Sequence, residues 1–293
     1  MPQASIVIVT RNRRDELRRA LLSAARQDGG HEVIVVDDAS DDGSADMVGK
    51  EFPDFRLIRS SRAMGYIVQR NRAARMARGE FIVSIDDDAE FSSPTIVNET
   101  IGLFTDLPSV GAVAIPYSDG PDHVREFQRA PDHENCWITG QFIGTAHALR
   151  RDLFLQLDGY DERLIHQGEE RDFCLRMLAQ GFFVRLGTSA AIRHHRSPRR
   201  DLRRMAYFGR RNDVLFVWRH VPFPQVIGRL LGTLLRGSIR GLFDGTIATT
   251  LKGIAAGLTD IIGGAGRHPV GRDCYAKYRQ LRGGTITVLP GNP

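Results

Sequence analysis

Cysteine is scarce in this 293-residue chain, and its three residues lie far apart at Cys136, Cys174 and Cys274. An odd count with no CxxC pair provides neither a disulfide framework nor a zinc-binding motif. The sequence therefore excludes the small disulfide-stapled proteins and the zinc modules. It favours a reducing compartment, and we predict a cytoplasmic location.

Long uncharged apolar segments are also missing. No run reaches the roughly 18 residues expected of a transmembrane helix. The first ten residues, MPQASIVIVT, contain no basic segment followed by an apolar one, so we expect no secretory signal. A hydrophobic content of 42% fits a globular protein with one large core or two modest ones.

Glutamate is absent from residues 201–293, which hold 14 Lys and Arg against 5 Asp and so carry a net charge of +9. The preceding residues hold 26 basic and 30 acidic side chains, a net charge of −4. A basic tail on a mildly acidic body suggests an anionic surface as the partner of the tail. No nucleic-acid motif accompanies this charge, so we expect no nucleic-acid partner.

The first part of the chain alternates strand patterns with helix patterns. Short β-branched runs predict strands, and amphipathic segments such as 14–27 predict helices between them. Continuous apolar strands joined by helices predict an α/β fold with a mostly parallel central sheet covered on both faces. The polar stretch 118–135 predicts a long loop. The predicted strands are 5–10, 32–38, 55–60, 80–85, 144–149, 182–186 and 189–194, and further helices are predicted at 44–52, 66–78, 151–157 and 169–180.

Three of these strands end in polar residues: Thr10-Arg11-Asn12, Asp37-Asp38 and Asp86-Asp87-Asp88. Ligands of open parallel sheets bind beyond the carboxyl ends of the strands, so these groups predict one site at one rim. The three adjacent carboxylates repel one another. They fit either a hard divalent cation, which takes oxygen ligands, or a solvated acidic turn.

Four motifs in order connect the chain to a known family. The chain resembles family 2 glycosyltransferases in four segments: SIVIVTRNR (5–13), VVDDASDDGS (35–44), GYIVQRNRAARMARGEFIVSIDDD (65–88) and the stretch 144–182. The resemblance covers about residues 1–220 and implies a GT-A fold that binds a nucleotide sugar. We therefore predict a GT-A catalytic domain at 1–220 and a basic, helical C-terminal extension at 221–293.

The resemblance also implies roles for the rim residues. Asp86 and Asp88 match the ends of the DXD motif, which would hold Mn²⁺ or Mg²⁺, with Asp86 or Asp87 contacting ribose or water. His194 at the end of the last core strand is a further metal candidate. Thr10 and Asp38, with Asp37 as the alternative, would hold the pyrimidine base. Further donor-binding candidates are Arg11, Asn12, Arg70 and Asn71.

Gly168-Glu169-Glu170-Arg171-Asp172 stands where the family carries its catalytic "ED" motif. The resemblance implies Glu170 as the general base, with Asp172 as the alternative. A purely structural explanation also exists, because carboxylates in the first turn of a helix are favoured by the helix dipole.

Residues 226–243 have the periodicity of a helix with arginines on one side and leucines centred on the opposite side. Such a basic amphipathic helix can lie in a membrane interface, here the inner face of the membrane. Packing on the catalytic domain or in a homodimer is the alternative.

Together these features predict an inverting, metal-dependent transfer of a sugar from a UDP or dTDP donor to a hydroxyl of a glycan, lipid-linked or secondary-metabolite acceptor. Two alternatives stay open at this point. One is a sugar-1-phosphate nucleotidyltransferase, although no glycine-rich loop follows the first strand. The other is an inactive glycan-binding or scaffold protein of the same fold.

Overall fold

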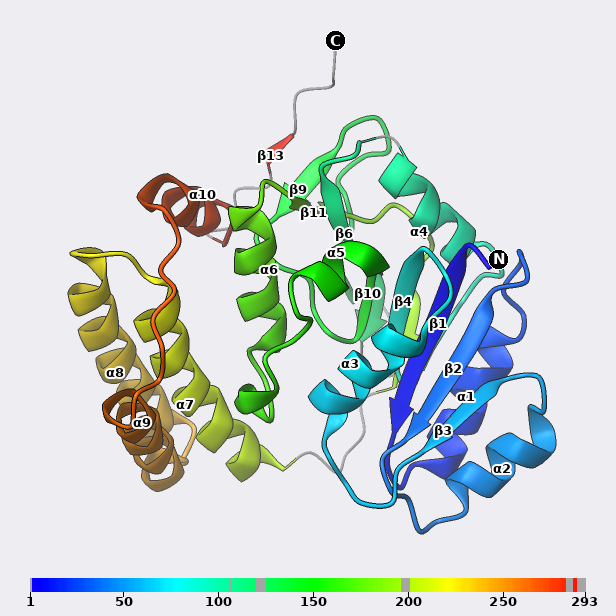
Figure 1. Cartoon of the computed structure of the whole chain (residues 1–293), viewed down its shortest axis with the longest axis horizontal. Coiled ribbons are helices and arrows are strands. Elements are labelled where there is room, and N and C mark those ends of the chain that lie inside the picture. The colour runs from blue at the N-terminus through cyan, green and yellow to red at the C-terminus, as the bar shows by residue number, and fades with distance from the viewer. Residues whose placement is uncertain (1, 106, 120–124, 196–200, 283–286, 289–293) are drawn as a thin grey trace.

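The computed structural model describes residues 2–105, 107–119, 125–195, 201–282 and 287–288. Within these ranges, nine strands form a central sheet in the order β13-β9-β11-β6-β10-β4-β1-β2-β3 (Figure 1). The strands are β1 (Ala4–Thr10), β2 (Glu32–Asp37), β3 (Arg56–Arg59), β4 (Phe81–Asp86), β6 (Val110–Ala114), β9 (Trp137–Thr139), β10 (Ala146–Arg150), β11 (Phe183–Leu186) and β13 (Thr287–Val288).

The predicted mostly parallel sheet is confirmed. β1 pairs in parallel with β2 and β4, β2 with β3, and β11 with β6. β10 lies between β4 and β6 and runs antiparallel to both, and β9 runs antiparallel to β11. Because β1, β2 and β4 point the same way, their carboxyl ends meet at one rim, as expected.

Helices cover both faces of this sheet (Figure 1). Alternate strand residues point to opposite faces, so Ile6 and Ile8 of β1 belong to one buried cluster and Val7 to the other. The first face is covered by α1 (Arg14–Ala24), α2 (Ser44–Glu51) and α4 (Ile96–Thr105). The second is covered by α3 (Tyr66–Met76), α5 (Arg151–Gln156) and α6 (Glu169–Ala179), and the short 3₁₀ turn η1 (Glu162–Leu164) precedes α6.

A second sheet of four short strands in the described residues has the order β5-β12-β7-β8. The strands are β5 (Ala89–Glu90), β7 (Tyr117–Asp119), β8 (Arg125–Phe127) and β12 (Ile192–His194). The prediction of a loop across 118–135 was therefore wrong in part, because β7 and β8 pair within it. β5 follows the three aspartates directly, so its pairing with β12 brings His194 beside Ala89 at the acidic turn.

The C-terminal region is helical, with α7 (Leu202–His220), α8 (Gln225–Phe243), α9 (Ile247–Ile262) and α10 (Arg272–Arg282). The helix predicted at 226–243 is confirmed as α8. Tyr275 and Tyr278 of α10 pack with Leu175 of α6 and Phe216 of α7, so the extension folds back onto the catalytic body. The division at residue 220 stays a prediction. No helix in the described ranges combines the length and the apolar character that crossing a bilayer needs.

Candidate active site

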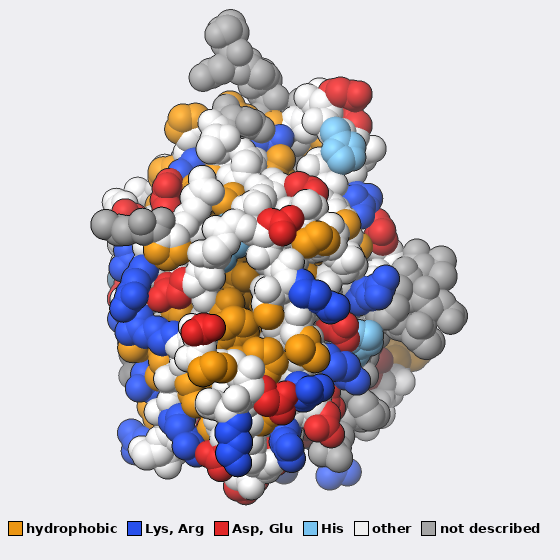
Figure 2. All heavy atoms as spheres, turned by 90° about the vertical axis from the view of Figure 1, so that its right-hand side faces the viewer, with side chains coloured by type: hydrophobic (Ala, Val, Ile, Leu, Met, Phe, Trp, Pro, Cys, Tyr) orange, Lys and Arg blue, Asp and Glu red, His pale blue; other side chains and the backbone are white. Residues whose placement is uncertain are grey.

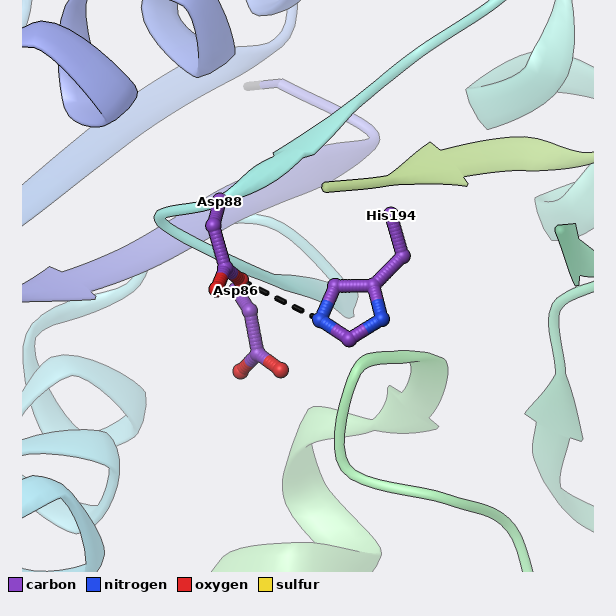
Figure 3. Close-up of side chains that lie close together, drawn as sticks. All are labelled: Asp86, Asp88 and His194. Carbon is purple, nitrogen blue, oxygen red and sulfur yellow. Dashed lines mark ion pairs between the residues drawn. The ribbon is translucent and has the colours of Figure 1, made fainter. Parts of the chain in front are cut away.

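The acidic turn after β4 meets the end of β12 at the rim of the sheet. Asp86, Asp88 and His194 each offer a ligand atom, and these atoms lie within 4.8 Å of one another. Figure 3 shows both carboxylates near the imidazole, with Nε2 of His194 3.3 Å from Oδ1 of Asp88. Two carboxylates at the end of β4 and the imidazole at the end of β12 form a donor set suited to a divalent cation.

Asp87 has different partners, and one of them was missed by the sequence interpretation. Nη1 of Arg13 donates to Oδ1 of Asp87 at 2.9 Å and to Oδ2 of Asp88 at 3.0 Å, while the Thr10 hydroxyl donates to Oδ2 of Asp87 at 2.8 Å. Burial raises the pKa of Asp87 to about 7, against the opposing effect of the Arg13 charge. Arg13 thus offsets part of the carboxylate repulsion, and Asp87 is held inside the protein rather than offered to a cation.

The loops after β1 and β2 lie against each other at the same rim. Asn12 has a positive φ of 55°, accepts from the Asp41 N–H through Oδ1 and donates its own N–H to Ser40. Arg11 is exposed beside it. Asn12 therefore joins the two loops that were predicted to receive the donor.

The two aspartates at the end of β2 differ in their bonding. Asp38 accepts from the backbone N–H groups of Met64 and Gly65, and from Nε2 of Gln69 at 2.6 Å. Among the described residues, the Asp37 carboxylate accepts only the Ser40 N–H, at 3.3 Å from either oxygen. Most of the hydrogen-bonding capacity of Asp38 is thus used to hold the 64–69 segment, and Asp37 keeps more of its own.

Arg70 and Asn71 of α3 are both buried but form hydrogen bonds with different parts of the protein. Nη2 of Arg70 donates to Oδ1 of Asp86 at 2.7 Å and to the Gly144 carbonyl at 3.0 Å, and Nη1 lies 3.9 Å from Glu169. The Asn71 amide instead holds the backbone of Tyr160, donating to its carbonyl and accepting from its N–H. The structure therefore brings Arg70 to the candidate cation site, whereas Asn71 anchors the segment before α6.

The first turn of α6 opens onto a cavity of about 230 Å³. Glu170 lines this cavity, and its Oε1 accepts the Gly144 N–H at 3.2 Å. Glu169 is fully buried, and neither of its carboxylate oxygens has a hydrogen-bond donor among the described residues. Burial raises the pKa of Glu170 and raises that of Glu169 to about 8. The remaining lining residues are Gln141, Gln167, Gly168, Arg171, Gly209, Arg210, Asn212, Asp213 and Arg282.

Asp172 lies outside the lining of this cavity. Its carboxylate bonds Nε2 of His220 at 2.6 Å and Nε of Arg176 at 2.8 Å. Burial would raise its pKa, but the bond from His220 and the charge of Arg176 hold the pKa well below its usual range. A strongly acidic, doubly paired carboxylate is a poor proton acceptor, and it ties α6 to α7.

Two known proteins are similar in sequence to about half of this chain. The O-antigen chain rhamnosyltransferase WbaN of Salmonella anatum is 28% identical over 153 residues, which cover 46% of this chain and 48% of WbaN. The O-antigen biosynthesis protein RfbC of Myxococcus xanthus is 27% identical over 176 residues, which cover 52% of this chain and 14% of RfbC. The match thus spans about half of the first relative and a small part of the second.

Solved structures share the fold. The mannosyltransferase PcManGT of Pyrobaculum calidifontis, in complex with GDP-Man and Mn²⁺, aligns over 95% of this chain and 79% of its own, with a TM-score of 0.62 and 20% identity. GalNAc-T7 with UDP, GalNAc and Mn²⁺ aligns over 73% of this chain and 50% of its own, with a TM-score of 0.57 and 15% identity. At these identities the likeness establishes the GT-A fold alone.

The family itself is established by the sequence. The family model for glycosyl transferase family 2 matches residues 5–157, which is more than half of the chain and contains β1 through α5 with the acidic turn. The match shows that this chain belongs to glycosyl transferase family 2.

Proposed function

We propose that this enzyme transfers a sugar, with inversion at the anomeric carbon, from a UDP or dTDP donor to a hydroxyl of its acceptor. The observation that carries the proposal is the position of Arg70, which bonds Asp86 at 2.7 Å and lies 3.9 Å from Glu169. The Arg70 side chain therefore lies between the candidate cation site and the start of α6, where Glu170 is located. Family membership weighs against the nucleotidyltransferase alternative.

The donor diphosphate is proposed to bind with Mn²⁺ or Mg²⁺ at Asp86, Asp88 and His194. The donor set fits such an ion, because two carboxylates supply hard oxygen ligands and the imidazole supplies nitrogen. The bound ion would neutralise the charge that develops on the leaving diphosphate. Mn²⁺ in the PcManGT and GalNAc-T7 structures supports this assignment.

The pyrimidine base is proposed to lie at the ends of β1 and β2. A carboxylate there can accept the ring N–H of uracil or thymine. Asp37 has more acceptor capacity left than Asp38, whose oxygens already accept three N–H groups. Thr10, Arg11 and Asn12 border the same position.

Glu170 is proposed as the general base. Its carboxylate takes the proton of the acceptor hydroxyl as the acceptor oxygen forms a bond to the anomeric carbon. The bond from that carbon to the diphosphate oxygen breaks on the opposite face, and its electron pair leaves with the diphosphate. Burial raises the pKa of Glu170, which strengthens its carboxylate as a base.

The acceptor is proposed to enter the cavity beside Glu170. Polar groups such as Gln141, Asn212 and Arg282 line it, which suits the hydroxyl groups of a sugar chain. The relationship to two O-antigen proteins supports a growing polysaccharide or a lipid-linked glycan as acceptor. The three cysteines are widely spaced and form no CxxC pair, which supports the cytoplasm as the location.

The test is a thermal-shift panel of UDP, dTDP, GDP and CMP, each with and without Mn²⁺ or Mg²⁺. A ligand at 100 times its Kd stabilises the folded state by about 2.7 kcal/mol, a shift that is readily measured. We expect one pyrimidine diphosphate to stabilise the protein only with the cation, and Asp88→Ala to abolish the effect. Asp54→Ala, an exposed carboxylate away from the rim, is the matched control.

No shift with any nucleotide would overturn the proposal and leave a scaffold protein of the same fold. Stabilisation by GDP alone would retain the reaction but correct the donor base.

A further inference from the structure

Helix α8 exposes its large apolar side chains to solvent. Leu231 and Leu235 are each 63% exposed, and Phe243 is 86% exposed. Residues spaced by four or three fall along one side of a helix, so five of these side chains form one continuous stripe. We define the outer face of α8 as this stripe of Ile227, Leu231, Leu235, Ile239 and Leu242.

The inward side of the same helix is built from small residues. Gly237 and Gly241 are buried, and a Cβ at Gly241 would lie 2.8 Å from the Thr250 hydroxyl of α9. A Cβ at Gly237 would lie 3.2 Å from Arg210 of α7. The helix therefore packs by its glycines and presents its leucines outward, the reverse of the usual arrangement on a globular surface.

Positive charge lies on another side of the same helix. At about 100° per residue, Arg229, Arg236 and Arg240 lie within about 40° of one another and are centred about 140° from the middle of the apolar stripe, with Arg236 about 60° from its edge at Ile239. Arg240 pairs with Asp244 at 3.2 Å. Arg229 and Arg236 have no ion-pair partner in the described part of the chain, and α8 itself contains no acidic residue.

We propose that the outer face of α8 docks in the headgroup region of an anionic membrane. A helix with an apolar face and a separate basic face buries the apolar face at the boundary between headgroups and acyl chains, while its long arginine side chains reach the lipid phosphates. A protein partner would need acidic groups opposite the arginines, whereas anionic lipid supplies negative charge and an apolar layer at once. The helix is accessible, because Figure 1 places it at the outer edge of the molecule, farthest from the sheet.

The other side of the molecule has a different surface. Figure 2 looks at the right-hand side of Figure 1, where blue and red side chains are intermixed around the apolar atoms. Apolar exposure is concentrated instead in the C-terminal helices, which also contain exposed Leu251 and Ile262 in α9. The protein would therefore bind a membrane with α8 facing the lipid and the catalytic sheet farther from it.

Membrane docking at α8 has a consequence for the acceptor, and this step rests on the proposed function. Arg210 lines the cavity beside Glu170 and also contacts the inward side of α8 near Gly237. Only the thickness of the α7–α8 pair thus separates the cavity from the lipid. An acceptor glycan anchored in the same membrane by a lipid would have a short path to Glu170.

The test measures co-sedimentation of the full chain with vesicles of phosphatidylcholine alone or with phosphatidylglycerol added. We expect binding to the anionic vesicles, and loss of it in Leu231→Ser/Leu235→Ser by about tenfold for each side chain removed from the apolar layer. Arg229→Gln and Arg236→Gln should each weaken binding about fivefold. Leu202→Ser is the matched control, because Leu202 is 65% exposed but lies in α7.

Each outcome decides the proposal. Absence of vesicle binding overturns it, and so does an equal loss of binding in Leu202→Ser. A concentration-dependent dimer that the double serine variant disperses, without lipid binding, assigns the outer face to a second copy of this chain. Nucleotide stabilisation with Mn²⁺, measured on the same variants, should not change, so a failure here is distinguishable from failure of the proposed reaction.

Discussion

Nη2 of Arg70 donates a 2.7 Å hydrogen bond to Oδ1 of Asp86, although the two residues come from a helix and a strand on different layers of the fold. The guanidinium group is buried and charged, since the neighbouring carboxylates raise its pKa further against the effect of burial. Together with Arg13, Arg70 thus supplies positive charge to the carboxylates of this rim.

Replacing Arg70 with glutamine should destabilise the protein by about 3 kcal/mol, because Asp86 would lose its buried counter-charge. Urea unfolding measures the change. Arg72→Gln, in the same helix but bonded only to the Ser60 hydroxyl, should cost less than about 1 kcal/mol. Equal losses in the two variants would show that the Arg70 network contributes nothing specific.

Glu170→Gln should lower kcat by about 10²- to 10⁴-fold, because the amide cannot accept the acceptor proton. The affinity for the nucleotide and Mn²⁺ should not change, which calorimetry of the variant can verify. Glu169→Gln is the matched control in the adjacent position. The raised pKa of Glu169, about 8, keeps it mostly protonated at pH 7, so the neutral amide should preserve most of the activity. A severe loss in the Glu169 variant alone would reverse the two roles.

Asp172→Asn should destabilise the protein at neutral pH by about 3 kcal/mol, because it breaks the buried ion pair with Arg176 and weakens the hydrogen bond to His220. The folded-state pKa of Asp172 is depressed, so its ionisation stabilises the fold above the unfolded pKa of about 4 and less at lower pH. The stability difference between wild type and variant should therefore narrow as the pH falls below about 4. Unfolding curves from pH 7 down to pH 3 measure it, and a constant difference would contradict the pairing.

Gly253→Ala should loosen the contact between α9 and α7. A Cβ at residue 253 would lie 2.3 Å from the Tyr207 carbonyl oxygen, so the helices must separate. Gly228→Ala in α8 meets nothing within 4 Å and should stabilise its helix by up to about 1 kcal/mol. Thermal unfolding of both variants measures the contrast. A stable Gly253 variant would indicate that α9 docks weakly on α7.

The alternating strands and helices were predictable from local apolar periodicity. The rim at 10–12, 37–38 and 86–88 was predictable from the polar residues that end the strands. The reversal of β10 was not, since nothing in its residues states which neighbours it pairs with. Arg13 was missed for a similar reason. It stands in an arginine-rich stretch, and only the register of β1 against β4 places it between Asp87 and Asp88.

The roles of paired carboxylates were equally hard to assign from sequence. Glu169, Glu170 and Asp172 all occupy the first turn of α6, and each could have been the base. Their differences arise from distant partners: Gly144 for Glu170, and His220 for Asp172. Such pairings depend on tertiary packing, which a local motif does not encode.

The pairing of β5 with β12 determines when, during synthesis of the chain, Asp86, Asp88 and His194 can come together. Asp86 and Asp88 leave the ribosome early, but they reach His194 only when the strand at residues 192–194 has been made and has paired beside them. A nascent chain shorter than this therefore carries the acidic turn without its imidazole. The candidate cation site is thus completed late in translation, so a partly made chain would not offer all three ligands to an ion.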